Sequence, residues 1–313
     1  MQIAGQAFLL AGGLAVALVA SGRAVDYARA LAAALGAPAF IVGVALVGIG
    51  TDLPEIANAI VAHLQGEGDV NVGTAVGSAL TQYTLVLGLG PLVFAAAVIT
   101  RREASVVSLF TMMALAVTAA FIADGWLNRW EGTVLVVGWA LAIWVTAKLV
   151  PGLVEEDPPE VRYTKKRTQL GALLLALGLV AFGATVAVRS LIRVAELANV
   201  PEFLIAFFGA SVGTSAPEVI VVLAAFRRGA PAIAFGDAFG SSLSDSSLTI
   251  GVGGLTAPAA VTARTAVIGS VYSMLAVGVV ATLLAVRRRH DRWSGTAFVG
   301  LYALAFVVLI GSR

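Results

Sequence analysis

The stretch that decides the fold begins at Gly50-Thr51-Asp52-Leu53-Pro54-Glu55 and ends at Gly77-Ser78-Ala79-Leu80-Thr81-Gln82. It occurs again as Gly213-Thr214-Ser215-Ala216-Pro217-Glu218 through Gly240-Ser241-Ser242-Leu243-Ser244-Asp245. Each residue of the second copy stands 163 positions after its counterpart, as in the pairs 51 and 214, 55 and 218, and 82 and 245. Chance similarity between apolar segments would align Leu, Val and Ala, whereas here Gly, Pro, Thr and Glu coincide at one offset. The pattern indicates an internal duplication.

The composition around this stretch is that of a membrane protein. Of 313 residues, 59% are hydrophobic and only 12% are charged, against roughly 25% charged in soluble domains. Apolar segments recur at about 3–20, 37–63, 70–98, 105–123, 131–150, 170–190, 201–226, 231–257, 265–286 and 295–311. No basic residue precedes the first of them, which favours a membrane span over a secretory signal. The sequence predicts an all-α polytopic membrane protein with ten transmembrane helices.

The composition also excludes several classes of function. The chain has no cysteine, so it can form neither a disulfide nor a thiolate metal site. Its basic residues lie between apolar segments and do not gather on one face, which argues against binding to nucleic acid. Nothing in the sequence indicates a bound cofactor or an obligatory protein partner; the expected surroundings are the lipid bilayer.

The distribution of Lys and Arg predicts the orientation. Loops after odd-numbered spans carry fifteen of the 20 basic residues, and the other side carries five. Because positively charged loops stay in the cytoplasm, we expect both termini outside and the central loop inside. We expect the location to be the cell (inner) membrane.

The longest polar connection, residues 151–169, divides the chain into a first half, 1–150, and a second half, 170–313. Its acidic-then-basic sequence is typical of a solvated linker, and it is too short for a regulatory domain. With five spans each, the halves must cross the membrane in opposite senses. The sequence therefore predicts two inverted-topology repeats of five helices around a midplane site.

Five acidic residues lie inside the predicted spans and not at their ends: Asp52, Glu55, Glu218, Asp237 and Asp245. A carboxylate at mid-bilayer costs roughly 2.5–3.5 kcal/mol even on the lenient insertion scale. No Lys or Arg lies near mid-depth in the same spans. We therefore expect bound cations to supply the missing positive charge.

Oxygen atoms near these carboxylates complete the candidate site. Pro54 and Pro217 each remove a backbone donor just before a glutamate, which frees carbonyl groups of the preceding turn. The freed carbonyls are expected around Gly48 and Ser211, where they could turn toward a cation. Ser78 and Ser241 follow glycines, so they serve either close helix packing or ligation. An all-oxygen set suits Ca²⁺ and Na⁺, whereas His63 and His290, the only histidines, lie near span ends and do not suggest a Zn²⁺ or Cu⁺ path.

The paired Gly-Thr-x-x-Pro-Glu and Gly-Ser-x-x-x-(Asn/Asp) motifs resemble the α-repeats of the cation/calcium antiporter superfamily, with the prokaryotic sodium/calcium exchangers as the nearest branch. The resemblance covers effectively the whole chain. In that family the repeat glutamates bind both Ca²⁺ and Na⁺, which implies Glu55 and Glu218 here. The threonine after each motif glycine supplies oxygen ligands, which implies Thr51 and Thr214.

The polar residue that ends the second motif in that family corresponds to Gln82 and Asp245. This chain departs from the family pattern in three places. Asp52 stands where the family usually has Ser, whereas the second copy has Ser at the corresponding position, Ser215. Gln82 stands where the family usually has Asn. The usual Gly-Asn pair is replaced by Gly73-Thr74 and Gly236-Asp237. These changes leave the choice of coupling ion open.

Two functions on the same fold remain. The first is an antiporter that exchanges Ca²⁺ for Na⁺ by alternating access at one midplane site. The second is an antiporter that exchanges Ca²⁺ for H⁺, which the additional carboxylates allow. A passive channel is disfavoured, since one chain with a single pseudo-dyad cannot form a fourfold or fivefold ring. An intramembrane aspartyl protease is disfavoured too. Phe235-Gly236-Asp237 matches only part of the Gly-x-Gly-Asp motif of such proteases, since Ala234 stands in place of the first Gly, and no span contains a Tyr-Asp partner. We therefore expect a transporter and not an enzyme.

Overall fold

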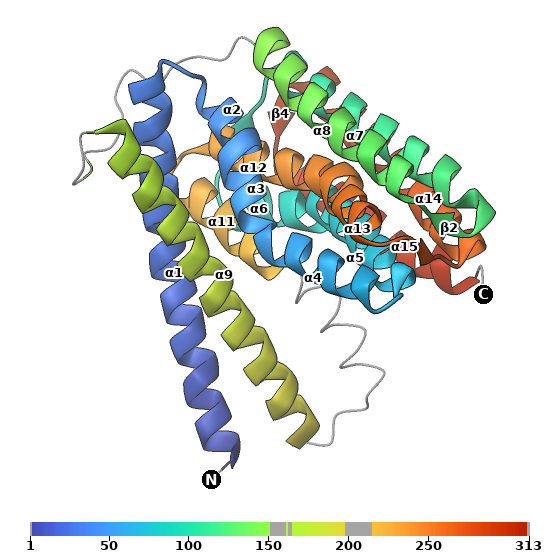
Figure 1. Cartoon of the computed structure of the whole chain (residues 1–313). Helices are drawn as coiled ribbons and strands as arrows, with labels where there is room; N and C mark the ends of the chain where they lie inside the picture. The colour runs from blue at the N-terminus through green and yellow to red at the C-terminus, as the bar shows by residue number, and fades with distance from the viewer. Residues whose placement is uncertain (1, 151–160, 162–164, 198–214, 312–313) are drawn as a thin grey trace.

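Helices build almost all of the computed structural model, which describes residues 2–150, 161, 165–197 and 215–311 (Figure 1). The first half contains, in order, α1 (Gln2–Leu35), α2 (Ala39–Val42), the π-helix η1 (Gly43–Val47), α3 (Gly48–Thr51), α4 (Leu53–Leu64), α5 (Gly68–Thr81), the π-helix η2 (Gln82–Val86), α6 (Leu87–Val93), β1 (Ala97–Val98), α7 (Arg101–Phe121), the 3₁₀ turn η3 (Ile122–Asp124), β2 (Trp126–Leu127) and α8 (Arg129–Leu149).

The second half repeats this order within its described residues. It contains α9 (Lys166–Leu197), α11 (Ala216–Arg227), α12 (Pro231–Leu243), the π-helix η4 (Ser244–Thr249), α13 (Ile250–Thr256), β3 (Ala259–Ala260), α14 (Ala263–Arg287), β4 (Arg289–His290) and α15 (Arg292–Gly311). The offset of 163 residues carries the bounds of α4 onto those of α11, and the bounds of α6 onto those of α13.

The helix between residues 39 and 64 is broken where the sequence predicts a break. The segments Ala39–Thr51 and Leu53–Leu64 meet at an angle of 47°. Asp52 occupies the bend, and Pro54 stands in the first turn of α4. Proline has no N–H for the carbonyl four residues before it, so the helix cannot continue straight through this point. Pro217 takes the same place in the first turn of α11.

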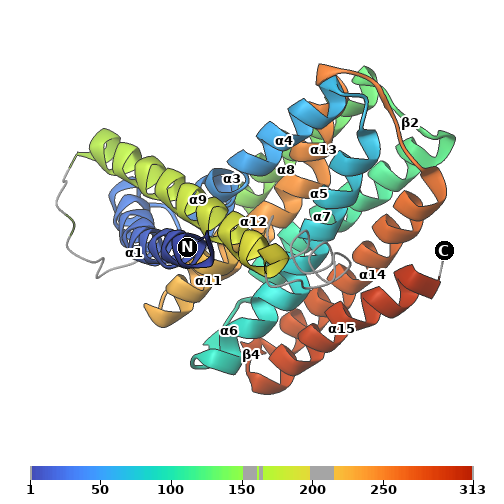
Figure 2. The same cartoon turned by 90° about the horizontal axis from the view of Figure 1, so that it is seen from below.

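Contacts between the halves follow a reciprocal pattern. The two long helices α1 and α9 run side by side in opposite directions, set apart from α7, α14 and α15 (Figures 1 and 2). Helix α7 packs on its counterpart α14, α6 packs on α15, and α8 packs on α13. Gly88 lies against Gly295 in the contact between α6 and α15, and Gly132 against Gly251 in the contact between α8 and α13. In each pair the backbone of one glycine occupies the space that a Cβ atom on the other glycine would need. Because neither residue has a Cβ atom, the helices can approach closely.

Two short ladders tie the loops of one half to those of the other. Strand β1 pairs with β4 in antiparallel register, with Ala97 opposite His290. Strand β2 pairs with β3, with Leu127 opposite Ala259. The first ladder joins loops that lie next to Arg101, Arg102 and Arg287 to Arg289. The β1–β4 ladder therefore brings two Arg-rich loops together at one end of the bundle.

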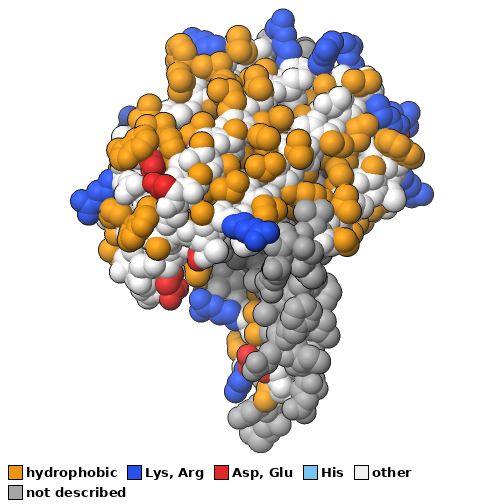
Figure 3. All heavy atoms as spheres, turned by 90° about the vertical axis from the view of Figure 1, so that its right-hand side faces the viewer, with side chains coloured by type: hydrophobic (Ala, Val, Ile, Leu, Met, Phe, Trp, Pro, Cys, Tyr) orange, Lys and Arg blue, Asp and Glu red, His pale blue; other side chains and the backbone are white. Residues whose placement is uncertain are grey.

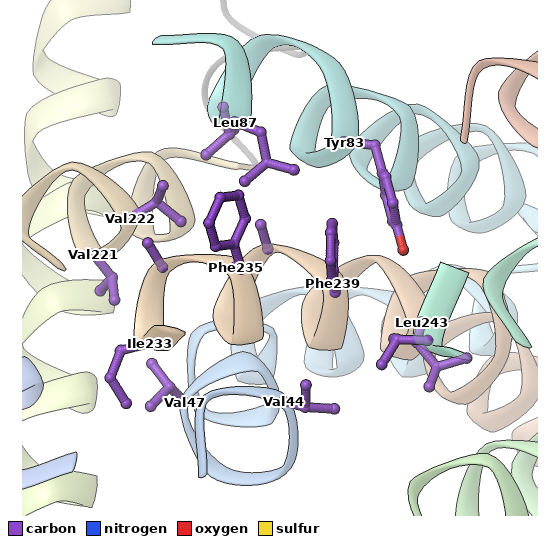
Figure 4. Close-up of a cluster of buried hydrophobic side chains, with 14 of the residues drawn as sticks. Val44, Val47, Tyr83, Leu87, Val221, Val222, Ile233, Phe235, Phe239 and Leu243 are labelled. Carbon is purple, nitrogen blue, oxygen red and sulfur yellow. The ribbon is translucent and has the colours of Figure 1, made fainter. Parts of the chain in front are cut away.

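The centre of the bundle is packed with aromatic and aliphatic side chains (Figure 4). Phe235, Phe239 and Leu243 follow one another along α12, beside Tyr83 and Leu87. The ring of Tyr83 stacks on that of Phe239 with centroids 4.8 Å apart. This cluster holds α12 and the η2 turn in a fixed relation, and both elements carry polar residues of the repeated motifs.

The described helices agree with membrane insertion but do not establish the predicted count of ten spans. Among the described residues, six helices are long and apolar enough to cross a membrane, or seven if the bent segment 39–64 is one span. On the face shown in Figure 3, hydrophobic side chains cover the middle, and most Lys and Arg side chains lie near its margins.

Several predicted boundaries differ from the structure. The first apolar segment was expected to end near residue 20, but α1 continues to Leu35. Arg23, Asp26 and Arg29 lower the hydropathy there, while Ala24, Ala28 and Leu31 remain buried. Helix α9 likewise begins at Lys166, inside the polar connection that was expected to extend to residue 169.

Candidate functional site

The candidate site begins at the bend before α4. The side chain of Thr51 is buried and donates a hydrogen bond to the carbonyl of Gly48, with 2.9 Å between the two oxygens. Its hydroxyl lies 3.2 Å from Oδ1 of Asp237 and 3.2 Å from Oγ of Ser241, both on α12. Ser241 also donates to the carbonyl of Gly48 at 3.3 Å. The bend of one half and the second motif of the other thus form one buried polar network.

Close backbone contact makes this network possible. A Cβ atom on Gly48 would lie 2.8 Å from the backbone nitrogen of Ser241. One on Gly43 would lie 2.8 Å from the Cα of Gly236. Only glycine permits such proximity, so the two backbones can bring short hydroxyl and carbonyl groups within hydrogen-bonding distance.

The second motifs of the two halves meet directly. The amide Nε2 of Gln82 donates to Oδ2 of Asp245 at 3.1 Å, which joins two residues that are 163 positions apart. Ser242 donates to Oε1 of Gln82 at 2.8 Å, and Thr249 donates to Oδ1 of Asp245 at 3.4 Å. Gln82 and Asp245 each begin or enter a π-helix. The wider π turn interrupts the regular helix ladder and is frequent at functional sites.

Five carboxylates are buried around these networks: Asp52, Glu55, Glu218, Asp237 and Asp245. They lie near enough to one another for their charges to interact, Glu218 with Glu55 and Asp52, and Asp245 with the same two residues. Within the described part of the chain, both oxygens of Asp52 and both oxygens of Glu218 lack a hydrogen-bond partner, and so do one oxygen of Glu55 and one of Asp237. Buried polar groups are nearly always satisfied, so this concentration of free acceptors is exceptional.

No basic side chain offsets these charges in the described part of the chain. The ion pairs found there lie elsewhere, between Arg193 and Glu196, Arg228 and Asp26, and Arg287 and Asp291. No three His, Asp or Glu side chains among the described residues come together closely enough to hold one ion between them. Any ion at this site must therefore also take hydroxyl or carbonyl oxygens as ligands.

A cavity of about 310 Å³ reaches the site from one side. It lies between α4 and α5 and is bounded by Glu55 at its inner end and by Gln65 and Glu67 in the turn between the helices. Asn58, Asn71, Thr74 and Thr249 add polar groups along its wall. Its lining offers oxygen atoms from the surface of the protein down to a buried glutamate.

The described structure brings together most of the residues expected from the sequence. Ser215 donates to the hydroxyl of Ser78 at 3.3 Å, which links the two copies once more. Thr214 and Ser211 were also expected in the site, but they lie outside the described residues.

Sequence reasoning missed three hydroxyl residues. Ser242, Ser244 and Thr249 are buried beside Gln82, Asp52 and Asp245. The signal was the run Ser-Ser-Leu-Ser-Asp-Ser-Ser at 241–247, which has more hydroxyl groups than its counterpart in the first half. Asp237 was noted among the acidic residues but not as a ligand, and it accepts a hydrogen bond from Thr51.

Comparison with known proteins decides the family. The family model described as sodium/calcium exchanger protein matches two segments of the chain, residues 5–148 and 168–311. The chain belongs to the sodium/calcium exchanger protein family.

Relatives in this family share most of the chain. The inner membrane protein YrbG of Escherichia coli is 31% identical over 265 residues, which cover 80% of this chain and 79% of that protein. The sodium/calcium exchanger MaX1 of Methanosarcina acetivorans is 24% identical over 338 residues, with 95% of this chain and 96% of that protein covered.

Solved structures of the sodium-calcium exchanger NCX_Mj have the same fold. The structure soaked with 2.5 mM Na⁺ and 0.1 mM Sr²⁺ is 25% identical, covers 98% of this chain and 99% of its own, and has a TM-score of 0.79. Membership of the exchanger family makes the chain a membrane-embedded cation antiporter and not an enzyme.

Proposed function

We propose that this exchanger moves Ca²⁺ against Na⁺ by alternating access at a midplane site built on Glu55 and Glu218. The observation that carries the proposal is the set of buried carboxylate oxygens that have no hydrogen-bond partner among the described residues. A buried charge without a partner costs several kcal/mol, and no Lys or Arg in the described residues pairs with these groups. A bound cation restores the balance, and two kinds of cation that share the same oxygens compete for them.

The ligand set combines charge with neutral oxygens. Asp245 and Gln82, already hydrogen-bonded to each other, flank the glutamates on one side. The proposed neutral ligands are the hydroxyl or backbone oxygens of Thr51, Thr214, Ser78, Ser215, Ser241, Gly48 and Ser211. Six to eight oxygens suit Ca²⁺, and since no three acidic side chains of the described residues converge on one point, neutral oxygens would complete the set.

The arrangement that supports alternating access is a pair of inverted repeats of five spans, 1–150 and 170–313, joined by the linker 151–169. Support comes from the two matched family segments, whose first residues and last residues both differ by 163. It also comes from the reciprocal contacts of α6 with α15 and of α8 with α13. Two related halves that meet at one site can exchange roles, so the site opens to either side in turn.

The second candidate is exchange of Ca²⁺ for H⁺. The observation that favours it is Asp52, a fully buried carboxylate whose two oxygens find no hydrogen-bond partner in the parts of the chain that the structure describes. A carboxylate can carry a proton as well as bind a cation, whereas its counterpart Ser215 can only offer a neutral oxygen.

The experiment is Ca²⁺ flux into vesicles that contain the purified protein, driven in one arm by a Na⁺ gradient and in the other by a pH gradient. We expect Glu55→Gln and Glu218→Gln each to lower Na⁺-driven flux at least about 100-fold, since removing one charged partner from a buried ionic site costs about 3 kcal/mol or more. Glu196→Gln is the matched control, because Glu196 is exposed, pairs with Arg193 and is not one of the buried carboxylates. Near-normal flux in either site variant would remove that glutamate from the site. Flux driven only by the pH gradient in the unaltered protein would favour the second candidate.

A further inference from the structure

A second feature of the molecule, away from the carboxylates, is an apolar groove between α1 and α9. Its volume is about 830 Å³. On α1 it is lined by Val16, Val19, Arg23 and Tyr27, which recur at helical spacing along one face. On α9 it is lined by Gly171, Leu175 and Leu179, which are four residues apart.

We propose that this groove binds one phospholipid with an anionic headgroup. Residues 15–27 of α1 rise by about 18 Å along the helix axis, which is close to the thickness of one leaflet of the hydrocarbon core, about 15 Å. Val19 and Leu175 are largely exposed in the structure. The groove thus offers aliphatic side chains over the length of an acyl chain.

One end of the groove is polar and positively charged. Arg23 and Tyr27 of α1 and Thr168 of α9 lie there. Lys166 and Arg167 precede Thr168 in the first turn of α9 and are exposed. Arginine binds phosphate with two parallel hydrogen bonds, so the charge at this end complements an anionic headgroup.

Among the described residues, no acidic side chain forms an ion pair with Arg23. The nearest acid along α1, Asp26, is engaged by Arg228 of the segment after α11, with 2.9 Å between Nε and Oδ1. Arg23 is exposed at one end of the apolar groove, and the acid nearest to it along the helix is already paired. Its guanidinium group can therefore bind the phosphate of an anionic headgroup.

The glycines of α9 provide a selective way to close the groove. A Cβ atom on Gly171 would meet nothing within 4 Å and Gly171 lines the groove, so we expect Gly171→Leu to place its side chain in the groove. A Cβ atom on Gly178 would also meet nothing within 4 Å, and Gly178 does not line the groove. Gly178→Leu is therefore the matched control in the same helix.

The test is native mass spectrometry of the purified protein in detergent, titrated with phosphatidylglycerol or with phosphatidylcholine of the same acyl chains. We expect the unaltered protein and Gly178→Leu to bind one phosphatidylglycerol more tightly than phosphatidylcholine. Gly171→Leu is expected to lose both lipids. Arg23→Gln is expected to weaken phosphatidylglycerol binding about fivefold, the usual contribution of one basic residue near a membrane surface, and to leave phosphatidylcholine unchanged.

A control for charge is Arg102→Gln, which removes an exposed arginine at the start of α7. Binding by Gly171→Leu equal to that of Gly178→Leu would overturn the assignment to this groove. Equal affinity for the two lipids in the unaltered protein, or an equal effect of Arg102→Gln and Arg23→Gln, would overturn recognition of the headgroup. Arg23 is exposed, so its variant tests the proposal even if Gly171→Leu folds poorly.

Discussion

Asp52 is the residue at which the two halves of the candidate site differ in charge. Its counterpart is Ser215, and both stand at the N-terminal end of a helix that begins with proline in its first turn. Both side chains are fully buried. The first half therefore brings one more carboxylate to the site than the second half does at this position.

Replacing Asp52 by Ser makes the two halves alike and removes one group that can carry a proton. We expect Asp52→Ser to flatten the dependence of Ca²⁺ flux on pH between pH 6 and 9 and to strengthen its dependence on Na⁺. The measurement is Ca²⁺ uptake across this range, with and without a Na⁺ gradient. Identical profiles for the variant and the unaltered protein would mean that Asp52 takes no part in coupling.

Residue types and spacing were enough to predict the carboxylates, but not their partners. The offset between the copies shows which residues correspond, and it does not show which residues touch. Ser242 reaches Gln82 of the other half, a contact between non-equivalent positions that no one-dimensional pattern contains. His290 was expected only near the end of a span, and the structure finds it fully buried.

At the level of elements, the contact of the segment Ala39–Thr51, before the bend, with helix α12 depends on glycine. A Cβ atom on Gly236 would lie 2.8 Å from the Cα of Gly43, whereas one on its counterpart Gly73 would meet nothing within 4 Å. We expect Gly236→Ala to lower stability by about 1 to 3 kcal/mol because the backbones must separate. Gly73→Ala, the matched control, is expected to be neutral or to stabilise by up to about 1 kcal/mol through helix propensity.

The check for the glycine pair is thermal unfolding of both variants in the same detergent. A lower midpoint for Gly236→Ala and an unchanged or higher midpoint for Gly73→Ala are expected. If the two variants unfold alike, the close approach of the helices is not what the glycine at 236 provides.

The turn between α14 and α15 contains a group whose ionisation is linked to folding. Nε2 of His290 donates to the carbonyl of Leu87 at 2.9 Å, and the ring stacks on Phe298 with centroids 5.0 Å apart. Burial lowers the pKa of His290 to about 4, so the folded protein holds this ring neutral.

Because the pKa of His290 in the folded state is below the ordinary value of about 6.5, its contribution to stability is fully present above pH 6.5. It is lost as the pH falls from there toward 4. By pH 5 the loss is about 2 kcal/mol. Thermal unfolding from pH 7.5 to pH 5 should therefore show a steeper fall for the unaltered protein than for His290→Gln, which has no proton to gain. Parallel curves would mean that another group accounts for the acid sensitivity.

For the whole molecule, the two strand ladders give the predicted orientation a structural test. The β1–β4 ladder joins two Arg-rich loops, and the β2–β3 ladder joins two loops with few basic residues. The positive-inside rule places the first ladder in the cytoplasm and the second outside.

Cysteine labelling measures this orientation against a clean background, since the chain has no cysteine. Ala96, before β1, and Ala123, before β2, are both exposed. In intact cells a membrane-impermeant reagent should label Ala123→Cys and leave Ala96→Cys unlabelled, and opening the cells should expose Ala96→Cys. The reverse pattern would overturn the orientation predicted from the charges.

The sequence predicted the overall plan better than the ends of its elements. The constant offset and the apolar segments were sufficient for an all-helical membrane fold in two similar halves. Hydropathy could not show that α1 continues past Arg23, because the alanines that extend it are buried in contacts with other helices, and such contacts are not visible in local composition. Packing partners, and not local composition, determine where that helix ends.

The π turns carry information about ancestry. A π turn holds one residue more than the α turn that it replaces, so it records an insertion. Both halves contain one at the same place, η2 at Gln82–Val86 and η4 at Ser244–Thr249, and the offset of 163 is unchanged from Gly50 before the turn to Gly88 after it. Two independent insertions would have to coincide to leave the register intact. If the two halves arose by the duplication that the offset predicts, the extra residue was present in the single ancestral half before it was copied, and this irregularity is older than the two-part protein that now contains it.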